Sequence, residues 1–175
     1  MARTLNVQYD RELVGQLIQD DGGQMTFKYA ASWLGKQEPI ALSRSLPLRE
    51  ETFTQKECRG FFGGTLPEED NRKVIARILG ISDKNDFAML EQIGGECAGA
   101  ISFLPEDEEI PDDDDRYRDL ADAELAKILR ELPRRPLMAG EDGIRLSLAG
   151  AQDKIAVRID DGKISIPRGS APSSH

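Results

Sequence analysis

The 175-residue sequence lacks a long apolar segment and a secretory signal. No apolar run approaches the roughly 20 residues that a helix needs to cross a bilayer, which argues against a membrane protein. The first residues alternate polar and apolar side chains, whereas a secretory signal pairs a basic region with an apolar core. We therefore expect a cytoplasmic protein that makes no membrane contact.

Cysteine and positive charge are also scarce. The two cysteines, Cys58 and Cys97, lack the close spacing of a zinc or redox motif and lie among apolar residues, where a reduced thiol behaves as a small hydrophobic side chain. Only 23 Lys and Arg face 32 Asp and Glu, so the formal net charge is −9. Nucleic-acid binding requires a surplus of Lys and Arg on one face, and we expect no direct nucleic-acid contact.

The N-terminal residues predict a small antiparallel sheet. Apolar and polar residues alternate over 5–9, 13–18 and 25–29, and turn-forming residues separate these runs. A single helical turn around Trp33 is expected next, followed by another short strand over 40–43.

The middle of the sequence is predicted to be helical. The acidic run that begins at Glu68 suits a helix N-terminus, and this helix should end at Gly80. A second helix is expected over 86–93, with Gly94 as its stop. Residues 98–103 can then complete the sheet.

An acidic segment follows. Residues 105–115 contain eight carboxylates and two prolines, a composition that repels itself and resists regular structure. Calcium loops need glycine and regularly spaced ligands, so we expect a solvated linker without a metal site. Residues 119–132 predict an amphipathic helix with a buried apolar stripe, terminated by Pro133.

The C-terminal part predicts two further β segments around a loop of small residues. One segment covers 144–148, and a hairpin over 155–166 should turn at 160–162. Between them, the sequence SLAGAQDK (147–154) would let backbone N–H groups approach a phosphate. It matches neither GxGxxG nor GxxxxGK[ST], so a nucleotide-binding loop and an ordinary loop between antiparallel strands both remain open on spacing alone.

Six stretches, in this order, resemble one known family. They are residues 27–34, 45–49, 61–68, 93–100, 147–154 and 166–175. The first four are similar to the N-terminal subdomain of HipA-family serine/threonine kinase toxins of type II toxin–antitoxin systems. The fifth resembles the family's glycine-rich loop, and the sixth resembles the segment that leads to its nucleotide-contacting lysine.

The resemblance covers nearly the whole chain and implies an α+β fold. A small β-rich N-terminal subdomain with short helices would be followed by the beginning of a protein-kinase-like N-lobe. Residues 1–104 would form the subdomain, 105–118 the acidic linker, and 119–175 the start of the N-lobe.

The resemblance also implies site residues. The residues that would cover the ATP phosphates, mainly through backbone amides, are Ala149, Gly150, Ala151, Gln152, Asp153 and Lys154. Asp153 stands where the family is expected to have glutamate. Ser147 matches the serine that family members autophosphorylate, a self-inactivation switch, whereas the residues alone predict a solvent-facing strand hydroxyl at this position.

A function for a longer protein follows from the same resemblance. With ATP and magnesium it would phosphorylate a translation-related protein, such as an aminoacyl-tRNA synthetase, and a HipB-like DNA-binding antitoxin would restrain it. The family's phosphate-contacting lysine, catalytic aspartate and magnesium ligands have no counterpart here, so we expect the chain alone to be inactive. An alternative is a non-enzymatic module, like the HipA N-terminal subdomain, that docks on a separately encoded kinase and restrains it.

Overall fold

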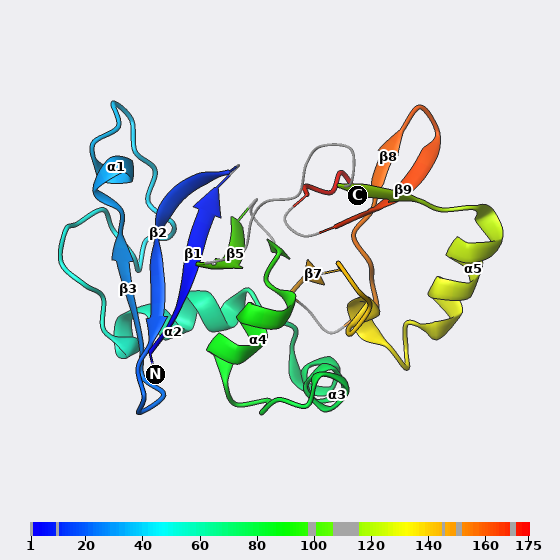
Figure 1. Ribbon diagram of the computed structural model, residues 1–175, viewed down its shortest axis with the longest axis horizontal. Helices are drawn as coiled ribbons and strands as arrows, with labels where there is room; N and C mark the ends of the chain where they lie inside the picture. The colour runs from blue at the N-terminus through cyan, green and yellow to red at the C-terminus, as the bar shows by residue number, and fades with distance from the viewer. Residues whose placement is uncertain are drawn as a thin grey trace.

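The computed structural model of the protein contains two sheets (Figure 1). It describes residues 2–9, 11–97, 101–106, 116–144, 146–149, 152–168 and 171–175, and only the backbone of Glu69, Glu96, Leu146 and Ser147. The larger sheet has the order β3-β2-β1-β5-β4-β7 and consists of β1 (Arg3–Tyr9), β2 (Glu12–Gln19), β3 (Met25–Tyr29), β4 (Glu96–Cys97), β5 (Ile101–Pro105) and β7 (Leu146–Ser147). The smaller sheet has the order β6-β9-β8 and consists of β6 (Tyr117–Asp119), β8 (Arg158–Asp160) and β9 (Lys163–Pro167).

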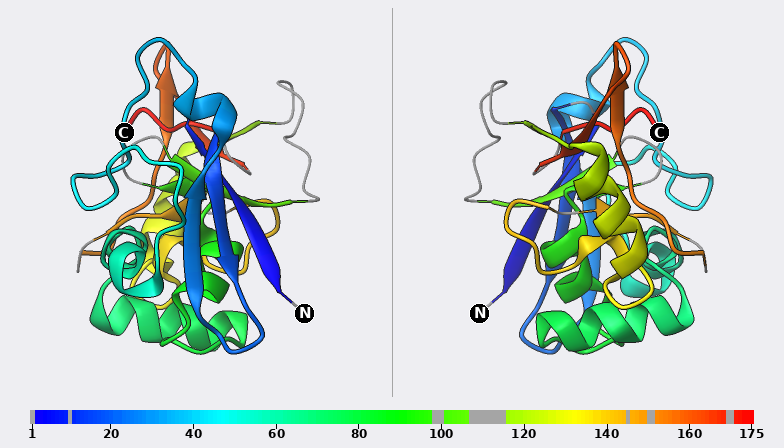
Figure 2. Two further views of the ribbon diagram at one scale, coloured as in Figure 1. Left: turned by 90° about the vertical axis from the view of Figure 1, so that its left-hand side faces the viewer. Right: turned by 90° about the vertical axis from the view of Figure 1, so that its right-hand side faces the viewer.

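Short helices accompany the sheets. They are α1 (Ala31–Leu34), α2 (Gln55–Gly64), α3 (Glu69–Leu79), α4 (Asp86–Ile93), α5 (Asp122–Glu131) and the 3-10 helix η2 (Pro136–Met138). Figure 1 shows α2 beside the lower part of β1, β2 and β3, with α4 and then α3 following further along the lower side of the molecule, where Figure 2 also shows the helices. In the part of the chain that the structure describes, every helix is much shorter and more polar than a bilayer crossing requires.

The predicted N-terminal meander is confirmed. Strand β1 pairs antiparallel with β2, and β2 pairs antiparallel with β3, so that Leu5, Leu17 and Phe27 lie side by side on the buried face. The predicted helices α3 and α4 are also confirmed. Gly80 ends α3 in the left-handed conformation, with φ of 68°, which explains why glycine is favoured there.

Aromatic side chains form the centre of the core. Five of the six phenylalanines have no exposed surface, namely Phe27, Phe53, Phe62, Phe87 and Phe103. The Phe27 ring contacts those of Phe53 and Phe62, and the Phe62 ring contacts that of Phe103, with centroids 5.3 to 6.0 Å apart. These contacts attach α2 to both β3 and β5.

The predicted strand over 40–43 is wrong. The carbonyl of Ile40 accepts a hydrogen bond from the Trp33 indole at 3.0 Å, and the Leu42 N–H donates to the Tyr29 hydroxyl at 2.9 Å. Because these backbone groups bond to side chains, they are not available to a neighbouring strand. In this segment only Ser43 forms a β-bridge, and its partner is Leu46.

Helix α2 lies where the sequence analysis placed no helix. Its glycines at positions 60, 63 and 64 lower its intrinsic helix propensity. A local signal was nevertheless present, because Thr54 followed three residues later by Glu57 is a capping pattern. In the structure the Thr54 N–H and hydroxyl both donate to the Glu57 carboxylate at 2.8 Å.

Acid is expected to weaken this start of α2. Hydrogen bonds lower the pKa of Glu57 from 4.5 to about 2. The largest contribution comes from the Thr54 backbone N–H, followed by the Thr54 hydroxyl and then by Arg49. Since the pKa is lower in the folded chain, the contribution to stability is complete above pH 4.5 and is lost as the pH falls towards 2. The thermal unfolding midpoint should fall less over this interval in Glu57→Gln than in the wild type. Glu38→Gln, which removes an exposed carboxylate, should behave like the wild type.

The predicted helix over 119–132 begins later than expected. Residues 117–119 form β6, which pairs with β9, and α5 begins at Asp122. The stripe expected to be buried consists of Leu120, Leu125, Ile128, Leu129 and Leu132. It is wrong in part, because Leu132 is buried whereas Leu129 is 51% exposed. The residues before α5 belong to the smaller sheet, where Arg118 is paired with Ile166, so they are not part of the helix.

Residues on both sides of the acidic segment share one hydrophobic core. Leu137, Ile144, Ala156 and Ile166 belong to the same cluster of buried side chains as the N-terminal strands. The boundaries at 104 and 118 stay a prediction, and residues 107–115 of the predicted linker lie outside the described residues. Both cysteines are buried free thiols, as expected, and burial raises the pKa of Cys58 to about 11.

Candidate functional site

The predicted nucleotide-binding loop starts at the edge of the larger sheet. Strand β7 runs parallel to β4, with Leu146 opposite Glu96 and Ser147 opposite Cys97. The prediction that this loop connects two antiparallel strands of one hairpin is therefore wrong. The loop begins on the sheet that contains β1 to β5.

Residues 155–157, predicted as part of the returning strand, lie outside the strands. The Val157 N–H donates to the His175 carbonyl at 2.7 Å, and the N–H groups of Ser174 and His175 donate to the Val157 carbonyl. Val157 thus pairs with the last residues of the chain and not with β7. The hairpin turn at 160–162 is confirmed, because β8 and β9 pair antiparallel across it.

Both ends of the loop are anchored in the core. Ile144, before the loop, is 5% exposed, and Ala156, after it, is 2% exposed. Leu148 and Ile155 are partly buried and pack against the same cluster. The sequence alternation that suggested strands on both sides of the loop reflects this burial, because core-facing positions flank it.

In the described part of the loop, the Lys154 ammonium bonds within the loop, and two other side chains are exposed to solvent. The Lys154 Nζ donates to the Ala149 carbonyl at 2.8 Å, which closes the loop on itself and holds a positive charge beside it. Gln152 and Asp153 are exposed, so this side of the loop is open to a ligand. The described part of the loop thus carries one cation, Lys154, and one exposed carboxylate, Asp153.

Other predicted groups of this site lie outside the described residues. Gly150 and Ala151 are outside them entirely, and only the backbone of Ser147 is described. Among the described residues, no three His, Cys, Asp or Glu side chains gather closely enough to hold a metal ion.

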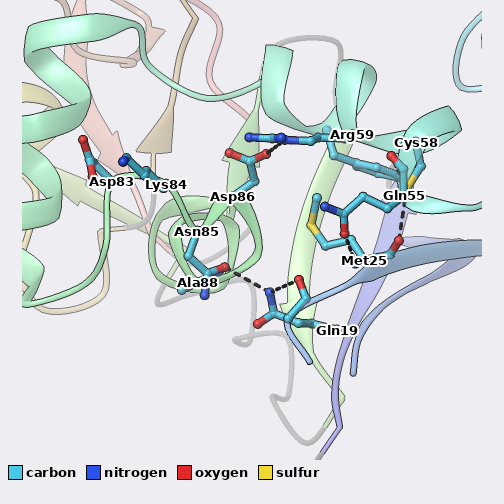
Figure 3. Close-up of polar contacts among 12 residues, drawn as sticks. Gln19, Met25, Gln55, Cys58, Arg59, Asp83, Lys84, Asn85, Asp86 and Ala88 are labelled. Carbon is cyan, nitrogen blue, oxygen red and sulfur yellow. Dashed lines mark hydrogen bonds and ion pairs between the residues drawn. The ribbon is translucent and has the colours of Figure 1, made fainter. Parts of the chain in front are cut away.

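A second polar cluster joins α2, α3 and α4 (Figure 3). Asp86, at the start of α4, is 7% exposed and accepts hydrogen bonds from Arg72 Nη2 and, at 3.1 Å, from Arg59 Nε. The neighbouring Asn85 Oδ1 accepts from Gln19 Nε2 at 3.1 Å. Asn-Asp before an apolar run marks a helix start in the sequence, but no local pattern connects it to arginines on two other helices.

Comparison with known proteins identifies the chain. The family model of the HipA N-terminal domain matches residues 5–104, which is more than half of the sequence. The chain belongs to the HipA family. Its mixed helix-and-strand fold and the order of its motifs agree with the family resemblance.

Related HipA-family proteins are considerably longer. One relative is Y4mE of Sinorhizobium fredii, whose name describes it as an inferred kinase. It is 46% identical over 177 residues, and the match covers 99% of this chain and 42% of Y4mE. The serine/threonine-protein kinase toxin HipA of Shewanella oneidensis is 27% identical over 173 residues, covering 98% of this chain and 39% of that protein. The chain thus spans about two fifths of the length of these relatives.

A solved HipA structure has the same fold over nearly all of the chain. It is a chain of the Shewanella oneidensis MR-1 toxin–antitoxin complex of HipA, HipB and operator DNA. The TM-score is 0.76 at 26% identity, and the match covers 97% of this chain and 39% of that chain. The HipA likeness therefore includes the C-terminal region that carries the loop, beyond the residues of the family model.

Proposed function

We propose that this chain is the N-terminal portion of a HipA-like serine/threonine protein kinase toxin. The observation that carries the proposal is the HipA N-terminal domain over 5–104, followed by a small-residue loop that is attached to the same sheet. The remaining kinase residues would come from further sequence or from another chain. No observation favours the alternative of a non-enzymatic docking module.

In this proposal, residues 149–154 cover the phosphates of ATP. Backbone amides of the loop are the main ligands, and Lys154 contributes positive charge from within the loop. ATP supplies the phosphoryl group when it is bound. Anchoring by Ile144 and Ala156 would keep the loop in one position, so that little order has to be gained when the nucleotide binds.

Autophosphorylation of Ser147 would switch the protein off. A phosphate adds nearly two negative charges and would repel a loop that otherwise receives the phosphates of ATP. Ser147 lies in β7, paired with β4, at the entrance to the loop. Displacing the loop would therefore also disturb the edge of the larger sheet.

The partners proposed for the whole protein are a HipB-like DNA-binding antitoxin and a translation-related substrate. The antitoxin is supported by the Shewanella oneidensis structure, in which HipA is found with HipB and operator DNA. DNA binding through the antitoxin fits the net charge of −9 on this chain. A protein such as an aminoacyl-tRNA synthetase would be the substrate, and the site of action would be the cytoplasm.

The predicted modification can be tested on Ser147. The 175-residue chain, incubated alone with ATP and magnesium, should acquire no phosphate, whereas a longer protein from the native host that contains the chain should be phosphorylated there. Ser147→Ala should abolish that phosphopeptide in mass spectrometry, and Ser45→Ala, at an exposed serine elsewhere, should leave it unchanged.

Two outcomes would contradict the proposal. Phosphate on Ser147 of the isolated chain would show that the described region is catalytically competent by itself. An active longer protein without phosphate on Ser147 would remove the self-inactivation switch. The intact mass of the protein from its host, compared with 19.4 kDa, shows whether a longer protein exists.

A further inference from the structure

An open hollow lies at the junction of α2, α3 and α4, away from the loop at 149–154. It has two adjoining lobes of about 350 and 700 Å³ that share Gln55, Arg59 and Asp86. Lys84 lines only the smaller lobe, and Lys56 lines only the larger one. We call these two lobes together the cationic hollow.

The charge of the cationic hollow is opposite to that of the protein. Its lining contains the cations Lys56, Arg59, Arg72 and Lys84 and a single carboxylate, Asp86. The whole chain has a formal net charge of −9. Four cations around one carboxylate therefore form a local positive field, which attracts anionic groups.

Much of this positive charge is not used within the fold. Asp86 pairs with Arg72, which also donates to the Asp83 carbonyl at 2.5 Å, so that Arg72 is held in place. Arg59 meets Asp86 through Nε, and its side chain remains 59% exposed (Figure 3). Within the described ranges, no hydrogen bond or ion pair engages the ammonium groups of Lys56 and Lys84. These cations are free to bind anionic groups of another molecule.

The α2 wall of the cationic hollow is bare. Gly60 and Gly64 lie on the same helix face as Lys56, and a Cβ at either glycine would meet no atom within 4 Å. Packing within the chain therefore does not require glycine at these positions, although glycine weakens a helix. The missing side chains leave room for the backbone of a bound segment to lie against the helix.

We propose that the cationic hollow binds an acidic, extended segment of a partner protein. The cations are distributed over the two lobes, with Lys84 in the smaller lobe, Lys56 in the larger one and Arg59 in both. Carboxylates spaced along a peptide fit this arrangement, whereas one compact phosphate needs donors that converge on a single point. The amide of Gln55 between the lobes can bond to peptide groups.

The proposal can be tested with the 175-residue chain and a short fluorescein-labelled oligoglutamate peptide. Fluorescence anisotropy should show binding that weakens with added NaCl, and an oligoglutamine peptide of equal length should not bind. The double variant Lys56→Gln/Lys84→Gln should weaken binding by about fivefold. The matched double variant Lys127→Gln/Lys163→Gln, which removes the same charge elsewhere on the surface, should change it by less than about twofold.

A steric variant separates a shaped site from a diffuse charge effect. Gly60→Leu keeps every charge but fills the α2 wall, and it should weaken the peptide as much as the double lysine variant does. Circular dichroism should show that all variants stay folded. Equal loss of binding in both double variants, no effect of Gly60→Leu, or displacement of the peptide by inorganic phosphate at constant ionic strength would each overturn the proposal.

Discussion

Phe62→Ala is expected to lower the free energy of unfolding by about 4 kcal/mol, which approaches the whole stability of a small domain. Phe62 has no exposed surface, and its ring lies 5.3 Å from that of Phe27 and 5.7 Å from that of Phe103. Truncation removes the contacts that attach α2 to β3 and β5, and it leaves a cavity between backbone elements that cannot close completely. Urea unfolding, followed by the fluorescence of the single tryptophan, Trp33, measures the loss.

The adjacent phenylalanine provides the control for this variant. Phe61 is half-buried at the edge of the same cluster, so Phe61→Ala should cost only about 1–2 kcal/mol. Both variants remove the same ring from the same helix and differ only in burial. Equal losses for the two would contradict the assignment of Phe62 to the centre of the core.

Asp86→Ala is expected to cost about 2–3 kcal/mol, because it leaves a partly buried guanidinium without its carboxylate. The side chain of Arg72 is only 18% exposed, and Asp86 is its anionic partner. The variant also removes the bond to Arg59 and thereby a link between α2 and α4. Chemical denaturation of purified variants measures the difference.

Asp70→Ala is the matched control for the Asp86 variant. Asp70 also lies in the first turn of a helix, and it pairs with Lys73, but its side chain is 89% exposed. The helix-dipole contribution of the two aspartates is therefore similar, whereas solvent screens the Asp70 pair. We expect a loss of at most about 0.5 kcal/mol for Asp70→Ala. A comparable loss in both variants would show that burial of the Asp86 network contributes little.

The position of β7 has a consequence for the proposed kinase function. Its pairing with β4 places the start of the loop at 149–154 on the sheet to which the matched HipA N-terminal domain contributes β1 to β5. The loop is thus positioned by the N-terminal domain, and its other end is fixed by Ala156 in the shared core. A partner that deforms this sheet would also shift the proposed nucleotide loop.

Local sequence patterns determined the elements whose stabilising contacts are close in the chain. The meander of β1, β2 and β3 follows from alternation and tight turns, and the stop of α3 follows from the conformational freedom of Gly80. The motif order also sufficed to identify the HipA family. Helix α2 also had a local signal, the capping pattern of Thr54 and Glu57, although its glycines lower its intrinsic helix propensity.

Only the tertiary structure decided the features that depend on distant partners. Ile40 and Leu42 look like strand residues, but side chains of Trp33 and Tyr29 bind their backbone groups. The pairing of β7 with β4 and the meeting of Lys56 and Lys84 around one hollow likewise join segments with no sequence relation to each other. Hydrogen bonds and charges act through space, so the sequence fixes the available groups, whereas the folded chain selects which of them meet.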